Sequence, residues 1–162
     1  MNAGARGFSL LEALIALLVI AIGLLGIASM QAASVYRTHV GALNGLASLE
    51  AQSMAARMTA NPGAFPVGSS VFAYATTNAA DVSSSTDCES AYCDSDAMAL
   101  YDLKQWGDGL ASALPDGKGA VACAGDPPQC TVTVSWLEKT MTPAAAGTAP
   151  IATRSYRLVV RP

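Results

Sequence analysis

The chain has little of what enzyme sites are usually built from. Its 162 residues include a single histidine, His39, and charged residues make up only 13% of the sequence. One histidine excludes a multi-histidine metal centre, and no Gly-x-Ser-x-Gly turn is present to expose a nucleophilic serine. Lysine and arginine are scattered without a basic run, and the formal net charge is −3. These absences argue against catalysis and general nucleic-acid binding, so we expect no catalytic residues, no metal and no cofactor.

Two polar clusters have the composition of a site without its spacing. Asp116-Gly-Lys-Gly119 is too short for a phosphate-binding loop, and we interpret it as a turn. Glu89, Asp94 and Asp96 lie close together in the sequence, which is a hint of calcium ligation. A solvated acidic loop that caps the next helix is the interpretation we favour.

One long apolar run dominates the N-terminal part of the chain. It extends from Phe8 to about Met30, and no residue between Ala13 and Ala28 carries charge or donates a side-chain hydrogen bond. About 20 helical residues cross the roughly 30 Å hydrocarbon core of a membrane. Arg6, the only charge ahead of the run, favours the cytoplasmic side, so the remainder should be exported. A secretory signal that is cleaved after the run is the alternative.

Glu12 is the exceptional residue of this run, because a secretory signal gives no reason for a carboxylate there. At that depth in a membrane a carboxylate costs about 2.5–3.5 kcal/mol on insertion scales. Such a residue is expected to have a cationic partner. The alternative is an ordinary anchor in which the Glu12 side chain extends to the membrane surface.

The segment Gly7-Phe8-Ser9-Leu10-Leu11-Glu12, followed by an apolar helix, resembles the N-terminal signature of type IV pilins and their relatives in type II secretion. The resemblance implies cleavage by a membrane prepilin peptidase after Gly7 and N-methylation of the new N-terminus, Phe8. It also implies that Glu12 pairs with the terminal amine of a neighbouring subunit during assembly. Cleavage would create that cation within the apolar zone, where Glu12 is the only anion.

The same resemblance implies where such a protein lies and what it contacts. The processed chain would span the inner membrane once, with its C-terminal domain in the periplasm, and would then enter a filament. Expected partners are the prepilin peptidase, other minor pilins and the major pilin, the inner-membrane assembly machinery and the lipid bilayer. No direct contact with nucleic acid is expected.

Helical character should continue past the apolar run to about Ala60. Residues 31–58 contain no proline, and Asn61-Pro62-Gly63 predicts the end of the helix. Apolar residues recur at near-helical spacing, with Leu46 and Leu49 beside them: Tyr36, Val40, Leu43, Ala47, Met54 and Met58. We divide the chain into a leader (1–7), a membrane or filament-core half of the helix (8–30), an amphipathic half (31–60) and a periplasmic C-terminal domain (61–162).

The exported domain should add one helix and a small antiparallel sheet. Helical spacing of apolar residues predicts a helix from Asp96 to Leu114, with Ser95 as its N-cap. Alternation with a period of two predicts strands at 120–123, 131–137 and 155–160, and a short strand at 71–74. A sheet that is polar on one face and packed on the long helix by the other gives an α+β, pilin-like fold.

Four cysteines lie beyond the apolar run, on the side expected to be exported. An even count in an oxidising compartment indicates two disulfides, for which three pairings exist. We expect the local pairing, Cys88–Cys93 and Cys123–Cys130, because the second pair flanks a predicted hairpin turn. Zinc binding is the weaker alternative, since the spacings are C-x4-C and C-x6-C.

Downstream segments narrow the resemblance to minor pilins of type IV pili. They are Arg57-Met-x-Ala-Asn-Pro62, Asp102-x-x-x-Trp106 with Leu114-Pro-Asp-Gly117, and Cys130-Thr-Val-Thr-Val-Ser-Trp136. We therefore expect a minor pilin that is assembled into a type IV pilus or primes it, with roles in twitching motility and adhesion. A minor pseudopilin of a type II secretion system and a membrane-tethered periplasmic binding module are the alternatives.

Overall fold

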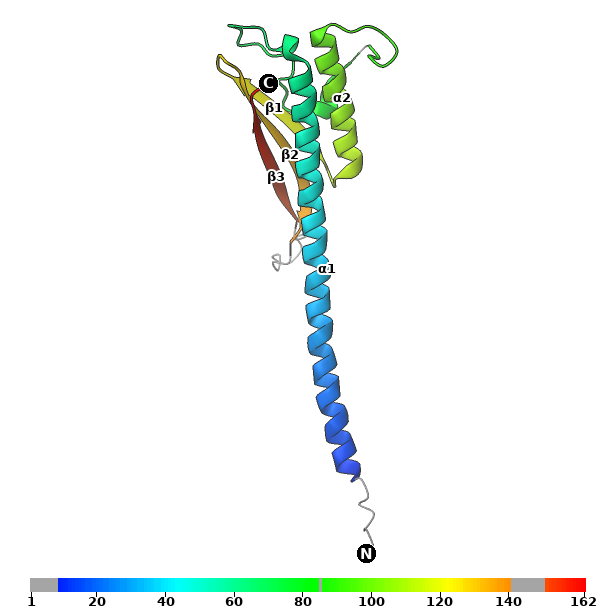
Figure 1. Ribbon diagram of the computed structural model, residues 1–162. Helices are drawn as coiled ribbons and strands as arrows, with labels where there is room; N and C mark the ends of the chain where they lie inside the picture. Colours follow the sequence, from blue (N-terminus) through cyan, green and yellow to red (C-terminus); the bar gives the residue numbers. More distant parts are fainter. Residues whose placement is uncertain (1–8, 85, 141–150) are drawn as a thin grey trace, which may run out of the picture. The chain divides into compact units, whose positions relative to one another are not determined.

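The computed structural model describes residues 9–84, 86–140 and 151–162 (Figure 1). Its regular elements are α1 (Leu10–Ala60), the short 3-10 helices η1 (Pro62–Ala64) and η2 (Ala79–Asp81), α2 (Ser95–Ala113), and the strands β1 (Lys118–Ala124), β2 (Gln129–Lys139) and β3 (Ile151–Val160). The predicted α+β architecture is confirmed: a long N-terminal helix packs on a small antiparallel sheet, and a second helix is added.

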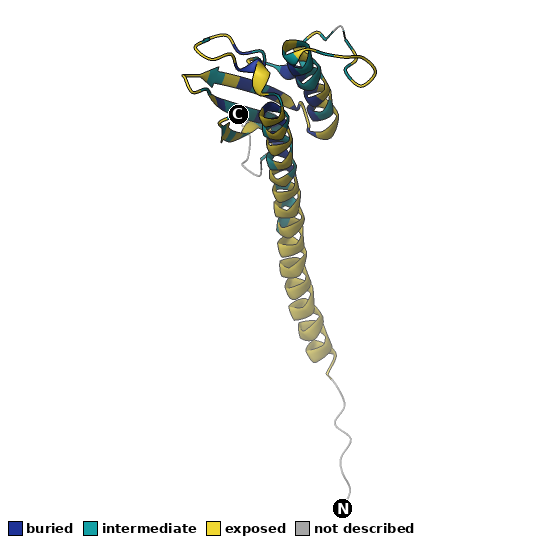
Figure 2. Ribbon diagram, turned by 45° about the horizontal axis from the view of Figure 1, so that its top comes forward, coloured by how far each residue is buried: buried dark blue, intermediate teal, exposed yellow. Residues whose placement is uncertain are grey.

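The described residues form two units, which divide within α1 between Gly41 and Ala42. The N-terminal unit contains α1 up to Gly41. The C-terminal unit contains α1 from Ala42 onward together with η1, η2, α2 and the sheet. The hydrophobic core lies in this second unit, and Figure 2 shows how burial is concentrated there.

The sheet is antiparallel with the strand order β1-β2-β3. Alternate residues of β2 face the core, and Cys130, Val132, Val134 and Trp136 are all buried. Side chains on the opposite face include Thr131, Thr133 and Ser135, as the period of two predicted. One face of the sheet is therefore apolar, and this face packs against the helices to form the core.

The last part of α1 contributes one face to this core. Its buried residues are Leu43, Ala47, Ala51, Met54 and Met58. Leu49, which the sequence places beside this face, is 64% exposed and does not join the core. A residue two positions from Ala47 and from Ala51 lies about 200° around the helix, on the solvent side.

α2 packs closely against η2, and Gly107 makes this approach possible. A Cβ atom added to Gly107 would collide with the backbone of Ala79 and Ala80. The α2 residues Ala99, Leu103, Trp106 and Leu110 are buried beside it, at the helical spacing predicted from the sequence.

Two local predictions are wrong. Residues 71–74 do not form a strand, and Phe72 and Tyr74 are buried from within a loop. Close by, the described residues form an isolated bridge between Thr76 and Val121. The N-cap of α2 is Asp94 rather than Ser95, since the Asp94 carboxylate accepts the backbone N–H of Ala97 at 2.8 Å.

Candidate functional site

The N-terminal end of α1 holds the first group of candidate residues. Ser9 directly precedes the helix, and its side-chain oxygen accepts the backbone N–H of Leu11 at 3.3 Å. The Ser9 carbonyl accepts the N–H of Ala13. Ser9 and Glu12 have the S-x-x-E spacing of a capping box, a helix-start signal that is present in the sequence but was not recognised there. Ser9 therefore caps α1 and sets where the helix begins.

Glu12 lies in the first turn of α1 and is exposed. The positive end of the helix dipole favours a carboxylate at this place. No cation lies within ion-pair distance of Glu12 among the residues that the structure describes. Gly7 and Phe8, the predicted cleavage and methylation residues, lie outside the described residues, so both assignments stay predictions.

The surface that follows Glu12 is apolar and uncovered. The large side chains from Leu10 to Met30 are all more than half exposed, with Leu10 at 80%. α1 contains a segment with a mean hydropathy of 2.8, which makes the helix long and apolar enough to cross a membrane. A continuous apolar surface of this kind marks contact with lipid or with other proteins.

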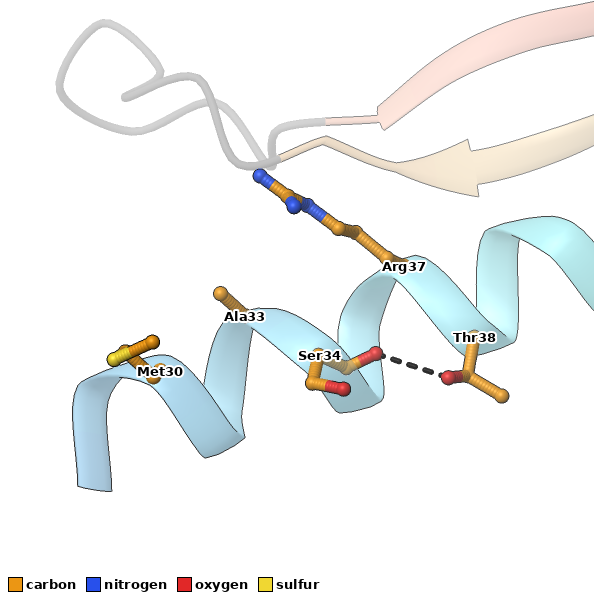
Figure 3. Close-up of a pocket in the computed structure, with 5 residues that line it drawn as sticks. All are labelled: Met30, Ala33, Ser34, Arg37 and Thr38. Atoms are coloured by element: carbon orange, nitrogen blue, oxygen red, sulfur yellow. Dashed lines mark hydrogen bonds between the residues drawn. The ribbon is translucent and has the colours of Figure 1, made fainter. Parts of the chain in front are cut away.

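Polar and charged side chains become frequent in α1 past Met30. Figure 3 shows a shallow hollow along the helix that is lined by Met30, Ala33, Ser34, Arg37 and Thr38. The Thr38 hydroxyl donates to the carbonyl of Ser34 at 3.0 Å, so it is satisfied within its own helix. Arg37 is the first charged residue after Glu12. His39, expected to be exposed or to pack between subunits, is exposed.

A polar network joins the C-terminal end of α1 to α2. The Arg57 guanidinium donates to the Asp102 carboxylate at 3.0 Å, and the Tyr74 hydroxyl donates to the other carboxylate oxygen at 2.8 Å. The amide of Asn61 donates to the Ser95 carbonyl at 2.8 Å and to the Tyr74 hydroxyl at 3.3 Å. Each of these side chains therefore has a partner from a distant part of the chain.

The network is electrostatically distinct from a surface ion pair, because much of it is covered. The Asp102 side chain is only 13% exposed and Tyr74 is fully buried. Burial raises the pKa of Tyr74 well above its usual range, and the adjacent Asp102 carboxylate raises it further, while the hydrogen bond from Asn61 acts in the opposite direction. Tyr74 is held neutral as a donor to Asp102.

Trp106 makes a second link between the two helices. Its indole N–H donates to the backbone carbonyl of Glu50 in α1 at 3.0 Å, and its ring is buried in the core. The motif residues Arg57, Asn61, Asp102 and Trp106 thus all contribute to fixing α2 on α1. Their hydrogen bonds are made within the chain, which is the arrangement of residues that hold the fold together.

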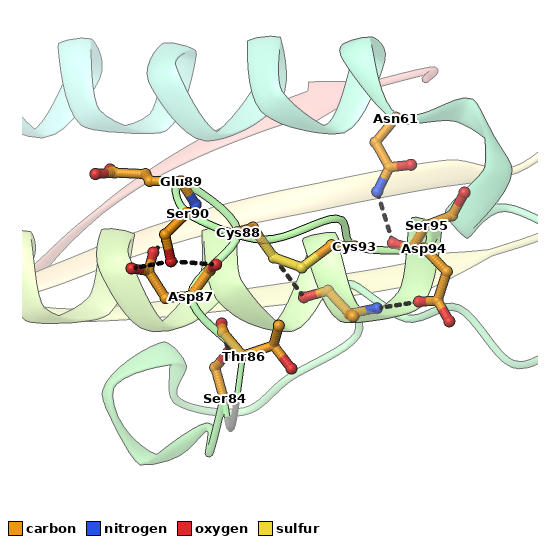
Figure 4. The surroundings of a disulfide bond; sticks show 11 residues. Asn61, Ser84, Thr86, Asp87, Cys88, Glu89, Ser90, Cys93, Asp94 and Ser95 are labelled. Carbon is orange, nitrogen blue, oxygen red and sulfur yellow. Dashed lines mark hydrogen bonds between the residues drawn. A yellow bond between two sulfur atoms is a disulfide. The ribbon is translucent and has the colours of Figure 1, made fainter.

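A disulfide between Cys88 and Cys93 closes a short loop in the segment before α2 (Figure 4). Beside it, Asp87 accepts a hydrogen bond from the Ser90 hydroxyl at 2.9 Å. The second disulfide joins Cys123 and Cys130 across the β1–β2 turn. Both are the local pairings expected from the sequence.

The acidic residues near this disulfide do not converge on one point. Asp94 caps α2, and Glu89 accepts from the Gln105 amide at 3.3 Å. Among the described residues, no group of three or more His, Cys, Asp or Glu side chains is arranged to hold a metal ion. The acidic loop that caps the next helix is the arrangement observed.

Comparison with known proteins gives one match. Residues 2–28 match the family described as the prokaryotic N-terminal methylation motif, the signal for prepilin peptidase cleavage and methylation in type IV pilin-like proteins. No curated protein and no solved structure matches the chain. The match covers Gly7, Phe8 and Glu12, and it supports a relation to pilins through the N-terminal segment alone.

Proposed function

We propose that the chain is a minor pilin, which acts by assembly rather than catalysis and is incorporated into a type IV pilus or primes its growth. The observation that carries this proposal is the methylation motif at residues 2–28, which places a lone carboxylate, Glu12, in the first turn of an exposed apolar helix. The downstream motifs at Arg57, Asp102 and Trp106 resemble those of the type IV minor pilin PilV. Such a protein would serve pilus biogenesis, twitching motility and adhesion.

The proposed mechanism follows from charge balance at the start of α1. Cleavage after Gly7 would leave an amine on Phe8, next to an apolar surface that has no other cation before Arg37. Packing that surface against neighbouring helices or lipid would strand the Glu12 carboxylate, at a cost of about 2.5–3.5 kcal/mol or more. The terminal amine of an adjacent subunit would neutralise it, and the pairing would set the axial register between subunits.

The decisive test replaces Glu12 with alanine. We expect Glu12→Ala to be processed and methylated normally, as measured by the intact mass of the mature protein, and to be depleted from sheared filaments. Glu50→Ala is the matched control, because it removes a carboxylate from the same helix beyond the apolar run. Normal incorporation of Glu12→Ala and normal piliation would contradict the role assigned to Glu12.

The processing step has its own test at Gly7. Alanine is small enough for a peptidase to accept, so Gly7→Ala should still be cleaved. A bulky replacement, Gly7→Leu, should retain the leader and show the mass of the full-length chain. A mature protein that begins at Met1 in the wild type would refute the pilin assignment and favour a membrane-tethered periplasmic module.

The motif is shared with pseudopilins, so a minor pseudopilin of a type II secretion system is the second candidate. It has the same predicted processing and the same apolar helix. A deletion strain separates the two functions: loss of pili with normal enzyme secretion supports the minor pilin. Blocked secretion with normal pili would assign the chain to the secretion system.

A further inference from the structure

The two edges of the sheet differ in what covers them. At the β1 edge, Thr76 and Val121 exchange two backbone hydrogen bonds, at 2.9 and 3.0 Å, and α2 packs beside the same strand. β3 is the last strand in the order β1-β2-β3, and among the described residues it pairs with β2 alone. Figure 1 shows β3, in dark red, on the side of α1 away from α2. The outer side of β3, here called the open edge, therefore has backbone groups free to pair.

The backbone groups at the open edge belong to the odd-numbered residues of β3. The N–H of Leu137 in β2 donates to the carbonyl of Pro115, just ahead of β1, so odd residues of β2 point toward β1 and even residues toward β3. The register pairs even residues of β2 with even residues of β3, as in Val134 with Tyr156. The outward N–H and C=O groups are then those of Ile151, Thr153, Ser155, Arg157 and Val159.

The core-facing side chains of β3 are only partly covered. Tyr156 and Leu158 lie opposite Val134 and Val132 of β2. The two valines are fully buried, whereas Tyr156 and Leu158 pack against the core and stay half-buried. A strand added beside β3 would place every second side chain next to this row and bury it further. The open edge therefore suits an extended segment that is apolar at alternate positions.

The open edge is also basic. Arg154 and Arg157 are exposed in β3, Arg161 directly follows the strand, and no acidic residue comes after Glu138 in the sequence. Arg154 donates to the buried carboxylate of Glu138 at 3.4 Å, whereas Arg157 and Arg161 have no anionic partner among the described residues. Opposite charges on neighbouring strands stabilise their pairing and like charges oppose it. The remaining positions of an added strand should therefore be acidic.

This chain does not itself supply such a segment. Pairing of β3 with the β3 of a second copy would bring the arginines of both copies together. The described acidic residues lie in helices, turns and loops, apart from Glu138, which already belongs to β2. Residues 1–8, 85 and 141–150 contain no acidic residue. The segment that matches the open edge in charge therefore comes from a different protein.

We propose that β3 is a docking site for an extended segment of a different protein, which alternates apolar with acidic residues and adds to the sheet as a fourth strand. Its apolar side chains cover Tyr156 and Leu158, and its carboxylates meet Arg157 and Arg161. Backbone hydrogen bonds supply affinity in this binding mode, and alternate side chains supply specificity. The arginines also oppose pairing between copies of the chain, as charges on edge strands commonly do. The inference goes beyond the proposed function and needs only the C-terminal unit.

The probe is a synthetic ten-residue peptide that alternates valine with glutamate and has blocked ends. It is added at saturation to the nitrogen-15-labelled full-length chain in non-ionic detergent micelles, and amide exchange is measured by NMR. The inward amides of Tyr156 and Leu158 already face β2, so their exchange should change little. Exchange should slow at least about tenfold at the outward amides, which are those of Thr153, Ser155, Arg157 and Val159.

Matched peptides separate strand addition from general attraction. A valine–lysine peptide keeps the apolar pattern with the charge reversed, and it should bind at least about tenfold more weakly in fluorescence anisotropy. Two further valine–glutamate peptides carry N-methyl groups on the glutamates or on the valines, because alternate residues direct their amides to opposite edges of a strand. One of these two should bind at least about tenfold more weakly than the parent peptide, and the other should bind equally well.

Variants of the chain test the same contact from its other side. Ser155→Pro removes one outward N–H and should weaken binding at least about tenfold, while the ladder to β2 stays intact because proline is tolerated where the N–H of an edge strand faces solvent. Ser155→Ala is its control. Arg157→Gln with Arg161→Gln should weaken binding about tenfold, whereas Lys118→Gln, which removes a cation from β1, should change it less than about twofold. Urea unfolding followed by tryptophan fluorescence verifies that each variant folds.

Three results would overturn the docking proposal. One is failure of the valine–glutamate peptide to bind, or binding no tighter than that of the valine–lysine peptide. Another is an equal effect of N-methylation on either set of residues. The third is protection of the outward amides without peptide, because the chain itself or a second copy would then occupy the open edge. Cleavage and methylation are measured separately by the mass of the mature protein, so these results would leave the minor-pilin assignment standing.

Discussion

Replacing Asp102 with alanine should destabilise the C-terminal unit by about 2–4 kcal/mol. Asp102 accepts from Arg57 and from Tyr74 with one carboxylate oxygen each, and its side chain is 13% exposed. Hydrogen bonds to charged groups contribute about 1.5–3 kcal/mol. The ion pair with Arg57 is partly solvated, so we assign it the smaller stabilisation of an exposed pair, about 0.5–1 kcal/mol.

Most of the stability that Asp102→Ala should lose comes from the hydrogen bond between Tyr74 and Asp102. The Tyr74 hydroxyl is buried and would lose its strong acceptor. The hydroxyl would still accept from Asn61 at 3.3 Å, but as a donor it would keep only the long contact to the carbonyl of Arg57 at 3.5 Å among the described residues. Asp102→Asn should cost less, about 1–2 kcal/mol, because the amide keeps one acceptor oxygen but loses the charge. A double-mutant cycle with Tyr74→Phe should give a coupling energy of about 1 kcal/mol or more.

The assay is urea unfolding of the oxidised full-length chain in mild detergent, followed by tryptophan fluorescence. Both tryptophans of the chain, Trp106 and Trp136, are buried in the core of the C-terminal unit, so their emission reports its unfolding. Asp108→Ala is the matched control on the same helix, because it removes only the exposed pair with Lys104 and should cost under about 0.5 kcal/mol. Equal losses for Asp102→Ala and Asp108→Ala would refute the argument.

Two further predictions use the same unfolding assay. Gly107→Ala should destabilise the C-terminal unit by about 2 kcal/mol or more, because a Cβ atom there collides with the backbone at 79–80. The control Gly109→Ala places its Cβ atom in open space and should stabilise the unit by up to about 1 kcal/mol. Equal effects of the two substitutions would contradict the close approach of α2 to η2. The pKa of Tyr74 is raised in the folded state above its ordinary value of about 10, which the unfolded chain keeps. The contribution of the neutral Tyr74 hydroxyl to the free energy of unfolding is therefore complete below about pH 10. It is lost as the pH rises further, by up to about 1.4 kcal/mol per pH unit. Tyr74→Phe should therefore flatten the alkaline loss of stability, and an unchanged slope would count against the shift.

Much of the fold was predictable because it is encoded in local periodicity. The buried face of β2 and the core face of α2 follow directly from alternation and from helical spacing. The segment Asn61-Pro62-Gly63 also predicted the end of the long helix correctly, since α1 ends at Ala60. Patterns of this kind succeed where one face of an element is buried along its whole length.

The wrong predictions concern residues whose local structure is determined by tertiary contacts. Phe72 and Tyr74 alternate as in a strand, but no strand among the described residues pairs with them, and their rings are buried from a loop. Glu138 continues the buried face of β2 with only 4% exposure, although its charge suggests a strand end. Asp94 and Ser95 can both cap a helix, and in the structure it is the Asp94 carboxylate that accepts the backbone N–H of Ala97.

The polar network could not be derived from the sequence, because its members are separated by up to 45 residues. Arg57 and Asp102 each look like an ordinary surface charge within an amphipathic helix. Their pairing depends on the crossing of α1 and α2, which Trp106 fixes through the carbonyl of Glu50. Opposite charges on two helices indicate a contact only once the helices are placed.

The charged residues near the two ends of α1 differ in whether the described residues supply a partner of opposite charge. Arg57 finds its carboxylate within the same chain, so substitutions there should act on the stability of an isolated molecule. Glu12 finds no cation among the described residues, and the apolar surface beside it is uncovered. Among the described residues, no cationic group is placed to neutralise this carboxylate. Substitution of Glu12 should therefore leave the C-terminal unit as stable as before and change only what the N-terminal helix binds.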